Sequence, residues 1–345
     1  MLVEAWADVF TGFSKVVESP PQVKQVMYRL PEPWNHEFPF LIWSEPDEVG
    51  STISQDGFWR DCIAHLSNVE RMRQRYPALP ARPRVLEIGG NIGACTLAFA
   101  AIDCEVTVFE PLPKNFAMLA QNLRLNPQLA ERVQLYPFAA SDHTEESVAH
   151  CQAGNAGNTV VVPKANADPK QSQSSLTAQP LEGVVGGNYQ SFDVWSLPLR
   201  WFLAPSTDQQ YLNKAMSTSF NIHRGKNEQP NAAFNFVKMD CQGCEPAAIR
   251  ELFALCKATR TELPATLAFE YSPVHWQYVL DSRRHGTRSP NSSGEGLDKM
   301  DIFRDLERYY DIADNSGRNL DWESQLDVVL DLCAWRKNQT ELRLP

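Results

Sequence analysis

The chain has 345 residues, of which 43% are hydrophobic and 21% charged, and this composition is typical of a globular enzyme with one elaborated domain or two small ones. The formal net charge of -10 argues against a protein that wraps a nucleic-acid backbone, because such binding depends mainly on lysine and arginine. The sequence contains no run of about 18 uncharged apolar residues, so we expect no membrane span.

The first 80 residues are expected to form an extension ahead of the main domain. Residues 1–19 lack the basic start and the cleavage site of a secretory signal. Proline-rich turns follow, and residues 56–76 then place apolar side chains at helical spacing. We therefore predict a helical, proline-rich extension over residues 1–80 that covers or supports the main domain of residues 81–345.

From residue 84 onward, the sequence alternates between strand and helix patterns. Strand patterns occur at 84–90, 105–111 and 132–140, and helix patterns occur between them at 95–102 and 115–126. Such alternation predicts parallel strands with right-handed crossovers. The expected fold class is therefore α/β, with a Rossmann-like, mostly parallel sheet and helices on both faces.

A long insertion is expected before the fourth core strand. Residues 164–230 are rich in Gln, Ser, Asn and Pro, and an aromatic stretch, "FDVWSLPLRWFL", interrupts them. The strand pattern resumes at 232–243, followed by a helix pattern at 245–256 and a further strand at 265–272. The insertion therefore separates two parts of one sheet.

The turn after the first core strand is the first candidate ligand site. In an open parallel sheet, ligands bind beyond the carboxyl ends of the strands. A dinucleotide site needs G-x-G-x-x-G, whereas the corresponding positions here are Gly89, Asn91 and Ala94. The missing glycines disfavour a pyrophosphate ligand, and with it a nicotinamide-dependent oxidoreductase. We favour a nucleoside cofactor that lacks a pyrophosphate, S-adenosylmethionine.

Three consecutive strand ends offer groups that suit separate parts of this cofactor. Its amino-acid end suits an acidic residue and the backbone of the glycine turn, namely Glu87, Gly89, Gly90, Asn91 and Gly93. Its ribose hydroxyls suit Glu110, which follows Glu87 by roughly the 20 positions expected for that role. Its adenine amino group suits Ser141 and Asp142, at the end of the third strand.

The strand ends further along the chain supply candidates for proton removal. Asp240 ends the fourth core strand, Glu245 begins the helix after it, and His275 follows the next strand. Glu245 is equally consistent with a first-turn acid that interacts with the helix dipole. We interpret Trp276 as a candidate contact for the acceptor.

Cys241 and Cys244 form a C-x-x-C motif, which raises the alternative of a zinc or redox site. Zinc needs further ligands at suitable spacing, and the sequence has no second C-x-x-C or paired-histidine motif. We therefore expect both cysteines to be buried in the turn, and no metal to be required. The eight cysteines have irregular spacing, unlike a small disulfide scaffold, which favours a reducing, cytoplasmic location.

Four motifs in order, "VLEIGGNIG", "FEPLPKNFAMLAQNLRLN", "FAASD" and "VKMDCQGCE", resemble the FkbM family of S-adenosylmethionine-dependent methyltransferases. The resemblance implies a class I methyltransferase fold. The family's first-turn pattern is present here as Glu87, Gly89, Asn91 and Gly93. Its second pattern is present as Lys238, Met239, Asp240, Cys241, Gln242, Gly243, Cys244 and Glu245.

This chain departs from the family pattern at two residues. Glu87 replaces the more usual aspartate, which is a small change in reach. Gln242 replaces a glutamate, which removes a charge that the family carries. The insertion also exceeds what the family leads us to expect, and it lies where acceptor specificity can be set.

The resemblance implies O-methylation of a hydroxyl on a sugar or another small-molecule acceptor. N-methylation is an open alternative, because the transferring end of the cofactor is the same. A degenerate methyltransferase fold that acts as a binding or scaffold protein is a second hypothesis, which Gln242 favours modestly. An RNA methyltransferase is disfavoured by the acidic net charge.

Overall fold

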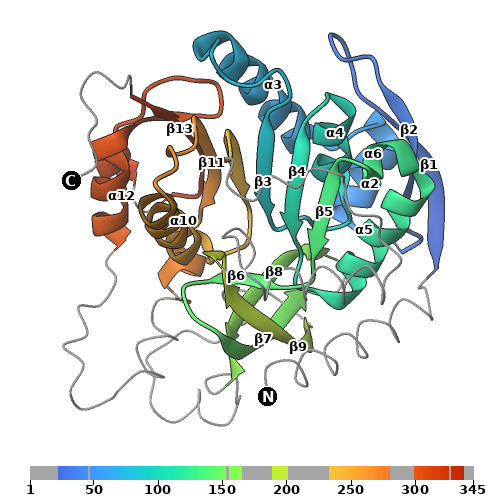
Figure 1. Ribbon diagram of the computed structural model, residues 1–345. Helices are drawn as coiled ribbons and strands as arrows, with labels where there is room; N and C mark the ends of the chain where they lie inside the picture. The colour runs from blue at the N-terminus through green and yellow to red at the C-terminus, as the bar shows by residue number, and fades with distance from the viewer. Residues whose placement is uncertain are drawn as a thin grey trace.

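A computed structural model describes residues 22–45, 47–152, 155–164, 189–200, 233–277, 279, 299–325 and 328–337 (Figure 1). Its main sheet has, among these residues, seven strands in the order β12-β13-β11-β10-β3-β4-β5. Five adjacent strands are parallel, and these are β3 (Arg84–Ile88), β4 (Glu105–Phe109), β5 (Val133–Tyr136), β10 (Phe236–Met239) and β11 (Thr266–Tyr271). The other two strands are β12 (Tyr310–Asp314), at the edge of the sheet opposite β5, and β13 (Leu330–Arg336), which is antiparallel to both of its neighbours.

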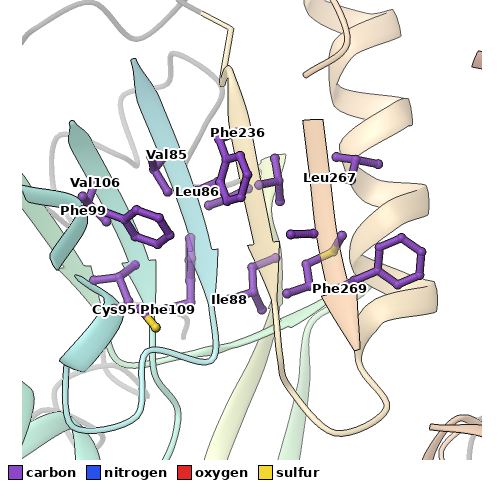
Figure 2. Packing of buried hydrophobic residues seen from close by; sticks show 14 of the residues in the cluster. Val85, Leu86, Ile88, Cys95, Phe99, Val106, Phe109, Phe236, Leu267 and Phe269 are labelled. Atoms are coloured by element: carbon purple, nitrogen blue, oxygen red, sulfur yellow. The ribbon is translucent and has the colours of Figure 1, made fainter. Parts of the chain in front are cut away.

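Helices cover both faces of this sheet, because its central strands are apolar on both sides. Phe236 of β10 packs against Phe99 on one face, with ring centroids 5.8 Å apart (Figure 2). The His65 ring lies 6.5 Å from the Phe236 ring. Phe269 of β11 packs against Phe303 on the other face, at 6.5 Å. The first face carries α3 (Arg60–Arg75), α4 (Ala94–Ala101) and α5 (Pro113–Leu125), and the second carries α10 (Glu245–Thr259) and α12 (Lys299–Tyr309). The predicted Rossmann-like α/β fold is confirmed.

In the described residues, the N-terminal extension begins with a β-hairpin. Its strands are β1 (Val23–Arg29) and β2 (Glu37–Trp43), and α2 (Glu48–Asp56) and α3 follow. The side chain of Asn122 in α5 accepts a hydrogen bond from the Leu41 N–H at 2.6 Å and donates to the carbonyl oxygens of Leu41 and Ile92. These bonds and a shared hydrophobic core join the extension to the main sheet.

A second, smaller sheet lies at the carboxyl edge of the main sheet (Figure 1). Its strand order is β6-β9-β7-β8, with bounds β6 (Ala139–Ser141), β7 (Glu145–Gln152), β8 (Asn155–Pro163) and β9 (Tyr189–Pro198). β9 contains the first part of the aromatic stretch predicted within the insertion. The rest of the insertion, 165–188 and 201–230, lies outside the described residues. The short helices are α6 (Pro127–Ala130) and η2 (Trp322–Gln325).

Two disulfides join four of the eight cysteines. Cys62 of α3 pairs with Cys95 of α4, and Cys241 pairs with Cys244 in the turn after β10. Disulfides persist mainly in oxidising compartments, so these bonds weigh against the reducing location expected from the irregular spacing. Among the described residues, no helix has both the length and the apolar character that a membrane crossing requires.

Loss of the two disulfides is expected to affect stability unequally. In the loop-closure treatment, Cys62→Ala with Cys95→Ala lowers the free energy of unfolding by about 4 kcal/mol, and Cys241→Ala with Cys244→Ala lowers it by about 2 kcal/mol. The difference arises because the sequence separations are 33 and 3. Urea denaturation of both variants checks this, and an equal loss of stability would contradict it.

Candidate functional site

A cavity of about 470 Å³ lies at the carboxyl ends of β3, β4, β10 and β11. Strand β8 of the smaller sheet forms a further wall, and α2 lies beside it. The Asn155 side chain of β8 donates a hydrogen bond to the Glu48 carboxylate of α2 at 3.1 Å. The extension and the smaller sheet thus meet beside the cavity.

The structure brings five of the predicted site residues to the wall of this cavity, namely Gly89, Asn91, Glu110, Asp240 and His275. The remaining candidates lie away from the wall, and these are Glu87, Gly90, Gly93, Ser141, Asp142 and Glu245. The glycine turn and the β10 turn therefore share one pocket, as expected from the carboxyl-end rule.

The glycines of the first turn are required by contacts within the protein. Gly89 has φ +87°, and a Cβ on it would overlap the backbone carbonyl of Asp240. A Cβ on Gly90 would overlap Val108. The N–H groups of Gly89 and Gly90 both donate to the carbonyl oxygen of Phe109, at 2.9 and 3.1 Å. These two amides therefore already have partners within the protein.

Glu87 lies behind the turn and is fully buried. Its carboxylate accepts a hydrogen bond from the Thr96 hydroxyl at 2.6 Å and lies 3.4 Å from the Lys238 ammonium. Burial raises its pKa, and the charge of Lys238 opposes that effect. Lys238 also donates to the Gly89 carbonyl at 3.0 Å and lies 3.5 Å from the Asp240 carboxylate. Glu87 and Lys238 therefore form a buried ion pair that stabilises the glycine turn through the Gly89 carbonyl.

Glu110 is buried at the end of β4, where it was predicted to lie. One carboxylate oxygen accepts the N–H of Asn91 at 2.7 Å, and the other accepts the N–H of Leu112 at 2.9 Å. Burial raises the pKa of Glu110 to about 8, although these two N–H groups oppose the shift. Each carboxylate oxygen has a second lone pair, so Glu110 can still accept hydrogen bonds from a ligand.

The third strand end differs from the prediction. β5 ends at Tyr136, and β6 begins at Ala139 and pairs with β9 of the smaller sheet. Ser141 is consequently fully buried, and the Asp142 carboxylate contacts the His143 imidazole at 2.6 Å. The pocket wall is formed instead by residues 138–140.

The turn after β10 is organised by Glu245, which is 1% exposed. Its carboxylate accepts the N–H groups of Cys241 and Gly243 at 2.9 and 2.8 Å, and the indole N–H of Trp276 at 3.1 Å. Burial raises its pKa to about 7. Trp276 is fully buried, which corrects its interpretation as an acceptor contact. Glu245 lies in the first turn of α10, as its alternative interpretation predicts, and it lies outside the cavity wall.

Carboxyl groups gather at the β10 and β11 side of the cavity. Asp61, Asp240, Glu270 and Asp331 all line it. Burial raises the pKa of Glu270 to about 8 and that of Asp61 to about 6, and neighbouring carboxylates add to both shifts. Burial also acts to raise the pKa of Asp240, but Lys238 and other neighbours outweigh it and hold that pKa below its ordinary value. In the described part of the chain, no group of three or more His, Cys, Asp or Glu residues is placed to hold a metal ion.

No family model matches the chain, and no curated protein matches it either. Among solved structures it is similar to a putative O-methyltransferase from Klebsiella pneumoniae, with 13% identity, 80% of this chain and 79% of that chain covered, and a TM-score of 0.30. It is also similar to the Thermus thermophilus 16S rRNA N2 G1207 methyltransferase in complex with AdoMet and guanosine, with 10% identity, coverages of 92% and 52%, and a TM-score of 0.34. A third is an Agrobacterium tumefaciens SAM-dependent methyltransferase, with 8% identity, coverages of 90% and 70%, and a TM-score of 0.32.

The lining residues that were not among the sequence candidates include Asp61, Asn115, Glu270 and Asp331. Glu270 ends β11, so the carboxyl-end rule that selected Asp240 also applies to it. Asp61 lies on α3 and Asp331 on the antiparallel strand β13, where that rule gives no signal. Asn115 lies within the "FEPLPKNF" motif, but the motif alone assigns it no role.

Proposed function

We propose that this protein is an S-adenosylmethionine-dependent methyltransferase that methylates a hydroxyl group on a small acceptor such as a sugar. The observation that carries the proposal is the charge of the cavity. In the described part of the chain, the formally charged side chains on its wall are all carboxylates. Such a wall suits a cationic nucleoside and disfavours a ligand with a pyrophosphate.

The unpaired polar atoms of the wall fit the same cofactor. Asn115 is 2% exposed, and its side-chain N–H donates to the Ala156 carbonyl at 3.2 Å. Within the described residues, the amide oxygens of Asn91 and Asn115 have no hydrogen-bond partner. Together with Glu110, they form a set of acceptors for the ribose hydroxyls and the adenine amino group.

The roles of the chain's own residues follow from their positions. The cofactor, when bound, supplies an electrophilic methyl group on its sulfonium. Glu110 holds the ribose, and the cavity holds the acceptor close enough for transfer. Asp240 is ionised at neutral pH and accepts the proton that the acceptor hydroxyl loses. His275, also on the wall, is the alternative base.

Calorimetry with S-adenosylmethionine, S-adenosylhomocysteine and NAD tests the proposal. We expect heats of binding for the first two ligands and none for NAD. Failure of both adenosyl ligands to bind would overturn the proposal and favour the scaffold hypothesis. Incubation with radiolabelled S-adenosylmethionine and a panel of sugars, amines and RNA then separates O-methylation from the other acceptor classes.

Glu110→Gln should weaken the binding of S-adenosylhomocysteine by about 1 to 3 kcal/mol, because the amide replaces one acceptor oxygen with an NH₂ donor and a hydrogen bond to the ribose is lost. Isothermal titration measures the change. Glu105→Gln is the matched control, because Glu105 lies at the opposite end of β4 and away from the cavity. Unchanged affinity in a folded Glu110→Gln protein would contradict the ribose assignment.

A further inference from the structure

Gln242 occupies the centre of the β10 turn and contacts two acidic side chains. Its backbone has φ +53°, which is uncommon for a residue other than glycine. Its side-chain amide nitrogen lies 3.1 Å from the Asp240 carboxyl group and 2.7 Å from the Glu270 carboxyl group. All three residues line the cavity. One amide therefore bridges the ends of two neighbouring strands, β10 and β11.

The chemistry of this contact requires an amide at position 242. The two N–H bonds of a glutamine side chain can each serve one carboxyl oxygen. An ionised glutamate at the same position has no donor, so it would place a third carboxylate against Asp240 and Glu270. Like charges at such separations are unfavourable, and burial strengthens the effect. The glutamine thus makes a close pair of carboxyl groups possible.

The surrounding charges distribute one proton and one negative charge over this pair. Asp240 faces the Lys238 ammonium on β10, which favours its ionised form. It also faces His65 on α3, but burial lowers the pKa of His65 to about 3, so this imidazole is neutral at neutral pH. Glu270 faces the carboxyl groups of Asp240, Glu245 and Asp331, which disfavour its ionised form. Burial raises the pKa of Glu270 to about 8. At neutral pH, Asp240 therefore carries the charge and Glu270 the proton.

Building on the proposed methyltransferase function, we propose that Gln242 is a positioning residue that holds Asp240 and Glu270 as a carboxyl pair with a single negative charge, which receives the proton of the acceptor. As the acceptor oxygen gains the methyl group, its O–H bond breaks and the proton passes to the Asp240 carboxylate. The electrons of the S–CH₃ bond remain on sulfur, so charge and atoms balance. The proton then leaves the pair to solvent.

The dependence of stability on pH tests the pair without an acceptor. Glu270 keeps its proton in the folded state above the pH at which the unfolded chain loses it. Folding stability from this group is therefore present at low pH and falls as pH rises through about 8. Gln242→Glu should steepen this fall, because a third carboxyl group must then ionise at the same place.

Urea denaturation of the full-length protein at pH 5 and pH 8 measures the effect. Between these values, we expect the unfolding equilibrium constant of Gln242→Glu to rise at least about tenfold more than that of the wild type, corresponding to one pKa unit. Gln128→Glu, on the exposed surface of α6, is the matched control and should follow the wild type. If the stability of Gln242→Glu and that of the wild type depend on pH in the same way, the proposed carboxyl pair of Asp240 and Glu270 is overturned.

A swapped variant separates pairing from a general structural role. In Gln242→Glu with Glu270→Gln, the amide lies on β11 and can again donate to a neighbouring carboxylate. Because this double variant again has two carboxyl groups and one amide, its stability should depend on pH as that of the wild type does. If its loss of stability instead equals the sum of the losses in the two single variants, no pair exists. If the Gln242→Glu protein does not fold at pH 8, rescue of folding by the swap supports the pair and failure of the rescue overturns it.

Binding of S-adenosylhomocysteine to the same proteins distinguishes the role of Gln242 from the proposed function. Binding by the wild type without any pH effect in Gln242→Glu would overturn the role of Gln242 alone. A clear pH effect without binding would leave the carboxyl pair intact and overturn the methyltransferase proposal, together with the proton transfer that depends on it.

Discussion

Gly89→Ala is expected to lower the free energy of unfolding by about 2 to 5 kcal/mol, the sum of a left-handed backbone penalty and overpacking. The added Cβ would overlap the carbonyl group of Asp240, and φ at this position is +87°. Because Asp240 begins the turn after β10, the added methyl group must push this turn and the glycine turn after β3 apart. Binding of S-adenosylhomocysteine should therefore weaken as well, and calorimetry on the folded fraction measures it.

Gly57→Ala is the matched control for this prediction. Gly57 has nearly the same backbone angle, φ +86°, but the nearest atom to its added Cβ is the Arg29 Cβ at 3.6 Å, an ordinary contact. Gly57→Ala should therefore lower the free energy of unfolding only by the backbone penalty, which is about 1 to 2 kcal/mol. Equal losses in the two variants would mean that the approach of Asp240 to Gly89 is unimportant.

The turn at Gly89 shows which parts of the site were predictable. The strand before it and the need for a glycine were both evident, because each is a local property of the sequence. The reason for the glycine was not evident, since Asp240 reaches it only through the pairing of β3 with β10. A contact between residues so distant in sequence depends on the order of strands in the sheet, which a local pattern does not specify.

The wrong placement of the third strand end has a different cause. The pattern at 132–140 was interpreted as one strand, but Pro137 lies between β5 and β6. Proline lacks the N–H that a strand within a sheet donates to its neighbour, so the chain leaves the main sheet there. Ser141 and Asp142 consequently belong to the smaller sheet and its following turn, away from the cavity wall. The proline was a readable signal.

The electrostatics of the site were predictable only in part. Acidic residues at strand ends were evident, and Glu110 and Asp240 do line the cavity. Their neighbours were not evident, because the partners of a buried charge come from other elements. Glu245 illustrates this point, since its two N–H donors are local but the indole of Trp276 follows a different strand. The sequence allows two roles for Glu245, and its contacts in the fold are those of a first-turn acid.

Lys238→Met is expected to lower the free energy of unfolding by about 3 to 5 kcal/mol, the usual cost of removing one partner of a buried ion pair. Lys238 is 4% exposed and is the cation closest to Glu87, which is fully buried. The loss should grow with pH, because Glu87 without its partner keeps a proton that the unfolded chain releases. Urea denaturation from pH 5 to pH 8 measures this dependence.

Two further variants test whether a buried, unpaired charge causes the loss of stability in Lys238→Met. Lys164 also contacts two carboxylates, those of Glu146 and Asp193 at 3.4 and 3.2 Å, but its side chain is 47% exposed. Lys164→Met should therefore change stability by no more than about 1 kcal/mol. Adding Glu87→Gln to Lys238→Met removes the fully buried carboxyl group and should recover much of the loss, because Asp240, the other carboxylate beside Lys238, has a side chain that is 40% exposed. If the double variant were as unstable as Lys238→Met, the loss would come from the other two partners of Lys238, which are the Gly89 carbonyl and the Asp240 carboxylate.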